Sequence, residues 1–549
     1  METLQTLKEA IVRRTEKQMK MIDERVVGAI LLLLLLVIPF EATGSSQACL
    51  PLQSAQPTED AIIPGALNGL VYRRVGTESL AMDAYRQPGS ERRPAVIVVH
   101  GGGWSSGSRV AYVGQFLELL TRSGYHWFSI DYRLGGERGR EAAVSDLRAA
   151  VDFVRCHAAE LRVDPQRIIL LGEETGGTMA ALVARQPAAG ISALIISGGD
   201  YPVPGMEAGA RWFSGLPPTL VIHGTDDHEV KPTLAAEFCR QLRQTGQICD
   251  DLPVEGASHR AENWWPSQWG YKERLIAWLD RQSGAKGGWG RSPYQVTQLR
   301  KDIVYDEAHG LKMDAWIPRG KGPFPAVILA HGGGWEAGDK VTYLTPVMRP
   351  LAEAGFAWFS IDYRLTPAVR HEEQLADLRA AIRFVYREAA RYNVDRQRIA
   401  ILGESASGQM VAQIATEGMP EVAAVVSFYG VYDFLPMATG RGRLGPRSIP
   451  ARLFGISELG RTESETLRRY SPINQVHVKM PPLLLLCGTA DGLFQQHQAM
   501  VAQLTRVGAP FETVELREAP HGMENWEGHP EWEFYRTRLT KWLDKWLKR

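Results

Sequence analysis

Residues 399–408 read Ile-Ala-Ile-Leu-Gly-Glu-Ser-Ala-Ser-Gly, and this segment is the strongest indication of the fold class. Its apolar first half predicts a buried strand, and the small residues that follow permit a sharp turn into a helix. Ser405 lies at that turn, where its hydroxyl would stand exposed above the end of a parallel sheet. Because a serine hydroxyl is barely ionised at neutral pH, Ser405 needs a histidine base held by a carboxylate to act as a nucleophile. Ser407 is a second candidate nucleophile, but its register in the motif disfavours it.

A matching acid and base follow Ser405 along the chain. Asp491 comes after the apolar run 483–486, and His521 lies in the segment Ala-Pro-His-Gly at 519–522. Both residues follow predicted strands, so the ends of parallel strands would bring them to the same edge of the sheet as Ser405. We therefore expect Ser405, Asp491 and His521 to form a catalytic triad.

Glycines upstream of these residues supply a further element of the site. His331 is followed by three consecutive glycines, and glycine leaves the backbone N–H groups uncovered, so that a reacting carbonyl oxygen can approach them. We expect the N–H groups of Gly332, Gly333 and Ala406 to form an oxyanion hole.

The chain is a repeat of itself. The segment His-Gly-Gly-Gly-Trp at 100–104 returns at 331–335, and the segment 127–134 returns at 358–365 with the same offset. In each copy, apolar runs of strand length alternate with helical patterns after a leading antiparallel hairpin. This alternation is typical of a mostly parallel sheet flanked by helices. The predicted fold class is therefore α/β, with two tandem domains.

The first copy differs from the second at the decisive position. Glu174 stands where the second copy has Ser405, whereas the acid and the base persist as Asp227 and His259. We expect a degenerate site that has lost its nucleophile and in which Glu174 forms an ion pair with His259. Two alternatives stay open, namely covalent attack by the Glu174 carboxylate and a binding role for the retained pocket, for example toward a carbohydrate.

At this point the sequence resembles the α/β-hydrolase superfamily, in particular the esterases related to hormone-sensitive lipase and the bacterial feruloyl and acetyl-xylan esterase-like group. The segments that carry the resemblance are 100–104, 331–335, 362–365, 403–406, 471–474, 488–491 and 521–522. The resemblance implies hydrolysis of carboxylic esters through an acyl-enzyme, without a metal or an organic cofactor. Ser407 departs from the family pattern, which has glycine there, and we expect the turn to tolerate it with slightly altered geometry.

The repeat also sets the domain plan. We expect a hydrolase-like domain without a nucleophile at 65–282, a Gly-rich linker at 283–297 and a catalytic domain at 298–549. The second domain carries additional residues at about 430–480. We interpret them as a lid-like insertion, and the alternative is a tolerated surface excursion.

Composition narrows the classes of function. Hydrophobic residues make up 44% of the chain and charged residues 23%, which is typical of folded soluble proteins rather than disordered or multi-span membrane proteins. Lys plus Arg and Asp plus Glu number 62 each, so no net charge attracts nucleic acid. The five cysteines include no CxxC pair, so any metal site would have to come from histidines and carboxylates. Cys239 and Cys249 either occupy core positions or form a disulfide in an oxidising compartment.

The N-terminus suggests export. Residues 26–38 form an uncharged apolar run that is too short for an ordinary membrane-spanning helix and fits the apolar part of a secretory signal. We expect residues 1–48 to be a signal peptide or an N-terminal membrane anchor. In the second case residues 26–40 attach a periplasmic or secreted protein to the membrane.

These observations predict a serine carboxylesterase that acts on short-chain or carbohydrate-linked acyl esters. One alternative is a non-catalytic binding or scaffold protein built on two hydrolase folds, since a fold does not prove an activity. Another is a serine amidase or peptidase. The sequence does not indicate the oligomeric state or the natural ester.

Overall fold

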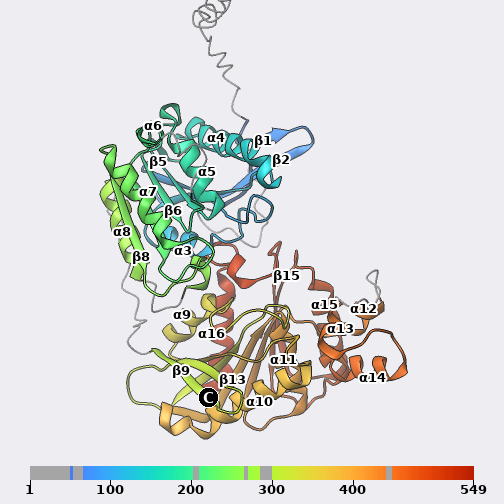
Figure 1. The fold of residues 1–549 in the computed structure, drawn as a ribbon. Helices are drawn as coiled ribbons and strands as arrows, with labels where there is room; N and C mark the ends of the chain where they lie inside the picture. The colour runs from blue at the N-terminus through green and yellow to red at the C-terminus, as the bar shows by residue number, and fades with distance from the viewer. Residues whose placement is uncertain are drawn as a thin grey trace, which may run out of the picture. The chain divides into compact units, whose positions relative to one another are not determined.

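Two eight-stranded sheets with the same plan carry the described part of the chain. The computed structural model describes residues 50–52, 66–201, 209–264, 270–284, 299–439 and 448–548, and residues 50–549 form one compact unit. In Figure 1 the first sheet and its helices run from blue to green, and the second from yellow to red. The predicted N-terminal signal or anchor (1–48) and nearly all of the predicted linker (283–297) lie outside the described residues.

The first sheet has the order β1-β2-β4-β3-β5-β6-β7-β8. Only β1 and β2 run antiparallel to their neighbours, and the remaining strands pair in parallel. Its strands are β1 Ala66–Val75, β2 Glu78–Tyr85, β3 Arg93–Val99, β4 His126–Ile130, β5 Val163–Glu173, β6 Ala193–Ser197, β7 Thr219–Gly224 and β8 Cys249–Val254. The main helices are α3 Gly114–Arg122, α4 Arg140–Cys156, α5 Thr175–Ala184, α7 Pro232–Gln244 and α8 Gly270–Ser283.

The second sheet repeats this order as β9-β10-β12-β11-β13-β14-β15-β16. Its strands are β9 Leu299–Asp306, β10 Leu311–Trp316, β11 Phe324–Ala330, β12 Ala357–Ile361, β13 Val394–Glu404, β14 Ala424–Phe428, β15 Leu483–Gly488 and β16 Phe511–Leu516. The main helices are α9 Thr345–Glu353, α10 His371–Arg387, α11 Ala406–Glu417, α15 Phe494–Val507 and α16 Phe534–Leu547. Two leading antiparallel strands and a mostly parallel remainder confirm the α/β class predicted for both copies.

Each sheet is covered on both faces, which explains why its central strands read as unbroken apolar runs. In β3, Ile97 packs with α4 and α5, whereas the neighbouring Val96 packs with α3 and α8. In β11, Ile328 faces α10 and α11, and Val327 faces α9 and α16. Because successive side chains of a strand point to opposite faces, a strand between two helical layers needs apolar residues at every position.

Additional helices fill the connection between β14 and β15 of the second copy. They are α12 Leu435–Thr439, α13 Ile449–Phe454, α14 Arg461–Arg469 and the short η8 Pro472–Asn474. In the described part of the corresponding connection of the first copy, the helix is α6 Ala210–Phe213. The insertion expected at about 430–480 thus contains short helices.

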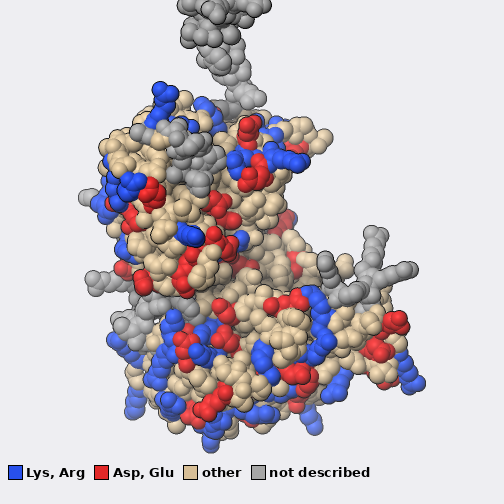
Figure 2. Space-filling view, viewed as in Figure 1, with Lys and Arg blue, Asp and Glu red and all other residues tan. Residues whose placement is uncertain are grey.

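Three further features bear on function. Cys239 of α7 and Cys249 of β8 form a disulfide, which decides between the two alternatives left open for them. Among the described residues, no helix is both long and apolar enough to cross a membrane. Figure 2 shows basic and acidic side chains interspersed over the visible face, in keeping with their equal numbers in the sequence.

Candidate active site

Ser405 lies in a strained turn between β13 and α11. Its backbone angles are φ 53° and ψ −113°, a conformation that non-glycine residues rarely adopt. Close packing of the backbone accompanies the strain. A Cβ atom on Gly403 would lie 2.3 Å from the carbonyl oxygen of Ser407, and one on Gly408 would lie 2.5 Å from that of Phe428. The glycines around Ser405 are therefore required by the turn itself.

The structure brings the three expected triad residues together. His521 Nε2 lies 3.1 Å from Ser405 Oγ, and His521 Nδ1 lies 2.8 Å from Asp491 Oδ2. The Asp491 carboxylate is buried and also accepts the backbone N–H of Leu493 at 2.7 Å. The hydroxyl, the imidazole and the carboxylate thus form one hydrogen-bonded chain, in the arrangement by which a serine is activated.

Two acidic groups raise the pKa of His521. Burial by itself lowers this pKa, but the hydrogen bond and the charge of Asp491, together with the charge of Glu404, outweigh it and raise the pKa above its ordinary value. The ring of Tyr429 lies against the imidazole, with centroids 4.6 Å apart. The imidazole is thus held in place and its protonated form is stabilised.

Glu404, the residue before Ser405, is a member of the site that the sequence motifs did not predict. Its side chain is buried, and burial raises its pKa to about 7. The carboxylate accepts the N–H of Gly332, so this amide, one of the three expected at an oxyanion hole, already has a partner in the structure. The return of Gly172-Glu173 as Gly403-Glu404 is the sequence signal that could have pointed to this contact.

Gly333 and Ala406 are the other residues expected at the oxyanion hole. Gly333 has φ 92°, and a Cβ atom there would lie 2.2 Å from the carbonyl oxygen of Ala337. Only glycine fits this loop conformation without strain. Ala406 is the first residue of α11, where backbone N–H groups have no partner within the helix.

Ser407 does not compete with Ser405. Its side chain is fully buried, and its hydroxyl donates to the carbonyl oxygen of Ala330 at 2.6 Å while accepting the N–H of Glu404 at 3.1 Å. In the first copy Gly176 stands at the place of Ser407, and Glu174 there has similar angles of φ 51° and ψ −121°. The turn thus accommodates a serine at position 407.

The first copy keeps the acid and the base in register. His259 Nδ1 lies 2.8 Å from Asp227 Oδ2, as in the second copy. The ion pair expected between Glu174 and His259 is not formed. Instead Glu174 Oε2 accepts the N–H of Gly102 at 2.6 Å and lies 3.8 Å from Arg260 Nη2. The Glu174 carboxylate points toward the glycine loop, where it has a backbone N–H donor and a positively charged guanidinium as partners.

A cavity of about 420 Å³ opens beside these residues of the first copy. It is lined by Trp104, Glu137, Arg140, Thr178, Asp200, Tyr201, Glu229, Val230 and Leu234. Glu229 connects the cavity to the site, because its carboxylate lies 4.0 Å from His259 Nε2. Burial and the charge of Glu174 raise the pKa of Asp200.

Part of the insertion packs against the glycine loop of the second copy. The rings of Trp335 and Phe434 lie 5.6 Å apart, and Arg452 forms an ion pair with Glu336. Gln409 of α11 donates to the backbone carbonyl of Tyr470 at 2.9 Å. The insertion therefore contacts both elements that border Ser405.

Comparison with known proteins now assigns the chain to a family. The family profile named BD-FAE matches residues 82–190 and 313–504, more than half of the chain and part of both copies. The protein belongs to the BD-FAE family. Membership confirms the resemblance to feruloyl and acetyl-xylan esterase-like α/β-hydrolases drawn from the motifs.

Curated relatives of this BD-FAE chain are named as ester hydrolases. The probable carboxylic ester hydrolase LipM of Mycobacterium tuberculosis (strain ATCC 25618 / H37Rv) is 28% identical over 268 residues, which cover 44% of this chain and 62% of LipM. Esterase LipC of the same strain is 28% identical over 256 residues, or 42% of this chain and 61% of LipC. The chain thus spans about three fifths of the length of these relatives.

Solved structures similar to this BD-FAE chain include a truncated carbohydrate esterase from gut microbiota. It is 23% identical, with a TM-score of 0.42, and the match covers 47% of this chain and 100% of that one. A bifunctional GH43-CE protein of Bacteroides eggerthii is also 23% identical, with a TM-score of 0.40, 46% of this chain and 36% of that one being covered.

Proposed function

We propose that the second copy is a serine carboxylesterase with Ser405 as its nucleophile. The observation that carries the proposal is the hydrogen-bonded chain from Ser405 through His521 to Asp491, with distances of 3.1 and 2.8 Å, on a strained strand-to-helix turn. A turn with only a structural role could adopt a relaxed backbone conformation. A strained one is typical of a functional site. The ester hydrolases among the relatives support the same reaction class.

The reaction proceeds in two halves. Ser405 Oγ attacks the ester carbonyl carbon while His521 Nε2 takes its proton, and the carbonyl oxygen becomes an oxyanion. Collapse of this intermediate breaks the ester bond, and the proton on His521 passes to the leaving alcohol, which leaves an acyl group on Ser405. A water molecule, deprotonated by His521, then attacks the acyl carbonyl carbon; the bond to Ser405 Oγ breaks, the carboxylic acid leaves, and the proton on His521 returns to Ser405 Oγ. Asp491 holds the imidazole and stabilises its protonated form throughout.

The first copy supports the assignment of the oxyanion hole. Gly102 is the counterpart of Gly333, and its N–H binds a carboxylate oxygen of Glu174 at 2.6 Å. In the first copy this amide thus donates to a carboxylate oxygen. The equivalent amide of the second copy, that of Gly333, would donate to the developing oxyanion. We therefore assign the oxyanion hole of the second copy to the N–H groups of Gly333 and Ala406. One such donor is worth about 3–4 kcal/mol in the transition state.

We further propose short-chain or carbohydrate-linked acyl esters as substrates. The curated relatives support the ester class, since they are named as an ester hydrolase and an esterase.

The first copy, in contrast, is proposed to bind rather than to catalyse. It has Glu174 rather than a serine at the position of Ser405, and the Glu174 carboxylate occupies the amide that an oxyanion would need. The cavity of about 420 Å³ beside it favours a ligand-binding role, since it lies within the range of small-molecule sites.

The cellular location is likewise a proposal. We place the protein in the periplasm or outside the cell, held to the membrane if residues 1–48 are an uncleaved anchor. The disulfide between Cys239 and Cys249 supports an oxidising compartment. Cell fractionation followed by N-terminal sequencing of the mature chain tests location and cleavage together.

The decisive experiment uses the full chain with a fluorophosphonate probe. Mass spectrometry should find the label on Ser405, and hydrolysis of p-nitrophenyl acetate should disappear in Ser405→Ala. Matched ester and amide substrates separate an esterase from an amidase or peptidase. A folded chain that takes no label and turns over no ester would refute the catalytic proposal and favour a binding protein.

A further inference from the structure

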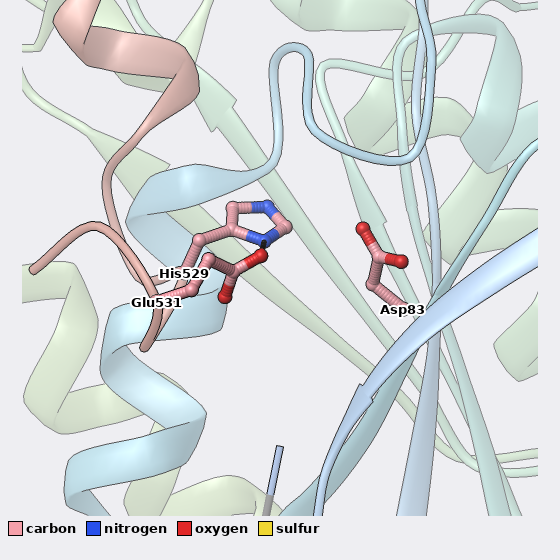
Figure 3. Close-up of side chains that lie close together, drawn as sticks. All are labelled: Asp83, His529 and Glu531. Carbon is pink, nitrogen blue, oxygen red and sulfur yellow. Dashed lines mark ion pairs between the residues drawn. The ribbon is translucent and has the colours of Figure 1, made fainter. Parts of the chain in front are cut away.

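Three metal-binding side chains meet where the two copies touch. Asp83 lies on β2 of the first copy, and His529 and Glu531 lie between η9 (Met523–Asn525) and α16 of the second. One donor atom from each lies within 4.8 Å of the others. Figure 3 shows the imidazole and the Glu531 carboxylate on one side, facing Asp83 across a narrow gap. None of these residues belongs to the proposed triad.

His529 lacks hydrogen-bond partners in this position. Its side chain is fully buried, and neither ring nitrogen has a hydrogen-bond partner. The closest acidic atom is Glu531 Oε1, which lies 3.8 Å from Nδ1. Burying a polar group without a hydrogen bond is unfavourable, so a ligand on this imidazole would remove that cost. A neutral imidazole nitrogen is a common metal ligand.

The negative charges of the carboxylates around His529 are only partly balanced by positive charge. Arg109 pairs with Asp83, Nε to Oδ1 at 2.9 Å, and with Asp131. Glu531 is therefore a third carboxylate near a single guanidinium, and its Oε2 has no hydrogen-bond partner. When all three carboxylates are ionised, they and the Arg109 guanidinium together carry a net charge of −2, which a divalent cation would neutralise.

The equivalent place in the second copy shows why the first is different. There Lys340 contacts Asp314, Asp362 and Asp302 at 3.2, 3.7 and 2.6 Å. The side chain of Asp302 is 54% exposed, so water solvates its charge. The Glu531 side chain is only 17% exposed, so water solvates its charge poorly. A bound cation would therefore balance this carboxylate.

We propose that Asp83, His529 and Glu531 form a structural site for a divalent transition-metal ion, for which Zn²⁺ is the probe. Imidazole nitrogen with carboxylate oxygens suits zinc better than calcium or magnesium, which prefer oxygen ligands. Zinc bonds of about 2 Å require the three donors to close to about 3.5 Å, a small adjustment of side chains. Asp83 Oδ1 is held by the Gly69 N–H at 2.7 Å and by Arg109, which leaves Oδ2 as the metal ligand.

Such an ion would strengthen an existing contact between the copies. In the same region Arg536 of α16 lies 3.2 Å from Glu118 of α3, and Trp127 of β4 packs edge-on against the His529 ring at 5.9 Å. Because the proposed ligands come from both copies, metal binding favours their association. An ion that binds only the folded chain raises its thermal stability by mass action.

The test uses the full chain, stripped with a chelator and titrated with Zn²⁺. We expect one tightly bound zinc per chain by elemental analysis after dialysis, and an increase in Tm of several degrees. His529→Phe keeps an aromatic ring between Trp127 and Trp532 but removes both nitrogens. It should match the wild-type Tm without zinc, bind zinc at least a hundredfold more weakly and show no zinc-dependent increase in Tm.

Two further variants make the result specific. Glu531→Gln should also weaken zinc binding. His309→Gln is the matched control, because His309 belongs to the other group of candidate ligands among the described residues, with Asp306 and Asp377. It should bind zinc like the wild type. Absence of zinc binding by the wild-type chain, unchanged binding by His529→Phe, or loss of binding in His309→Gln would each overturn the proposal. The readouts do not depend on esterase activity.

Discussion

The carboxylate of Glu174 accepts a hydrogen bond from the backbone N–H of Gly102 at 2.6 Å. It reaches this amide from a turn with the same backbone angles as the turn that holds Ser405. The first copy therefore retains the shape of the catalytic turn while its own side chain occupies the amide.

Replacing this carboxylate should restore a nucleophile. In a Ser405→Ala background, Glu174→Ser frees the Gly102 amide and places a hydroxyl on a turn that is already strained, in a copy where Asp227 still holds His259 at 2.8 Å. We expect slow fluorophosphonate labelling at residue 174, detected by mass spectrometry. Glu174→Gln in the same background has no hydroxyl and should stay unlabelled. Equal labelling of the two variants at another residue would contradict the prediction that Ser at position 174 acts as the nucleophile.

Loss of the proposed nucleophile should abolish activity without unfolding the protein. Ser405→Ala removes the attacking oxygen, and we expect kcat for p-nitrophenyl acetate to fall by about four to six orders of magnitude with Tm unchanged. Steady-state kinetics and thermal denaturation measure the two effects.

Ser407→Ala is the structural counterpart of that variant. It removes the hydrogen bonds that the buried hydroxyl makes to Ala330 and Glu404, so stability should fall by about 1–3 kcal/mol. Labelling of Ser405 should persist. Chemical denaturation measures the stability, and a Ser407→Ala protein that is folded but unlabelled would show that the two serines had been assigned the wrong way round.

Glu404 should contribute to the position of the acid limb in the pH dependence of kcat/KM. The base must be neutral to take a proton, so kcat/KM rises as the pH passes the pKa of His521, and a raised pKa moves this limb to higher pH. Part of the raising effect comes from Glu404. Glu404→Gln keeps an oxygen for the Gly332 amide and removes the charge, and the limb should therefore move to lower pH. A limb that stays in place or moves upward would exclude this coupling.

The disulfide should stabilise the first copy. Cys239 and Cys249 are ten residues apart, and closing such a loop is worth about 3 kcal/mol in the chain-entropy account. We expect the double substitution to serine to lower the free energy of unfolding of this copy by about that amount, as measured by chemical denaturation. Esterase activity at low temperature should be retained, because the disulfide lies in the copy without Ser405.

Contiguous motifs made much of the site predictable. Ser405, Asp491 and His521 each follow a strand that can be recognised from its own apolar run, and parallel strands deliver their C-terminal ends to one edge of the sheet. The repeat further allowed Glu174 to be aligned with Ser405. The motifs do not indicate where a polar side chain points. Glu404 accepts the Gly332 amide, and Glu174 accepts the Gly102 amide instead of pairing with His259.

The α/β class, the tandem repeat and the residues at the turns of Glu174 and Ser405 can be predicted from the sequence, because they depend on local periodicity and on short motifs. Tertiary structure decided which amides remain for an oxyanion, whether Cys239 and Cys249 pair, and that Asp83 meets His529 and Glu531. These outcomes depend on distances between residues far apart in the chain. Hydrogen bonds and metal coordination require donors to approach within a few ångströms, and only the packed fold fixes that approach.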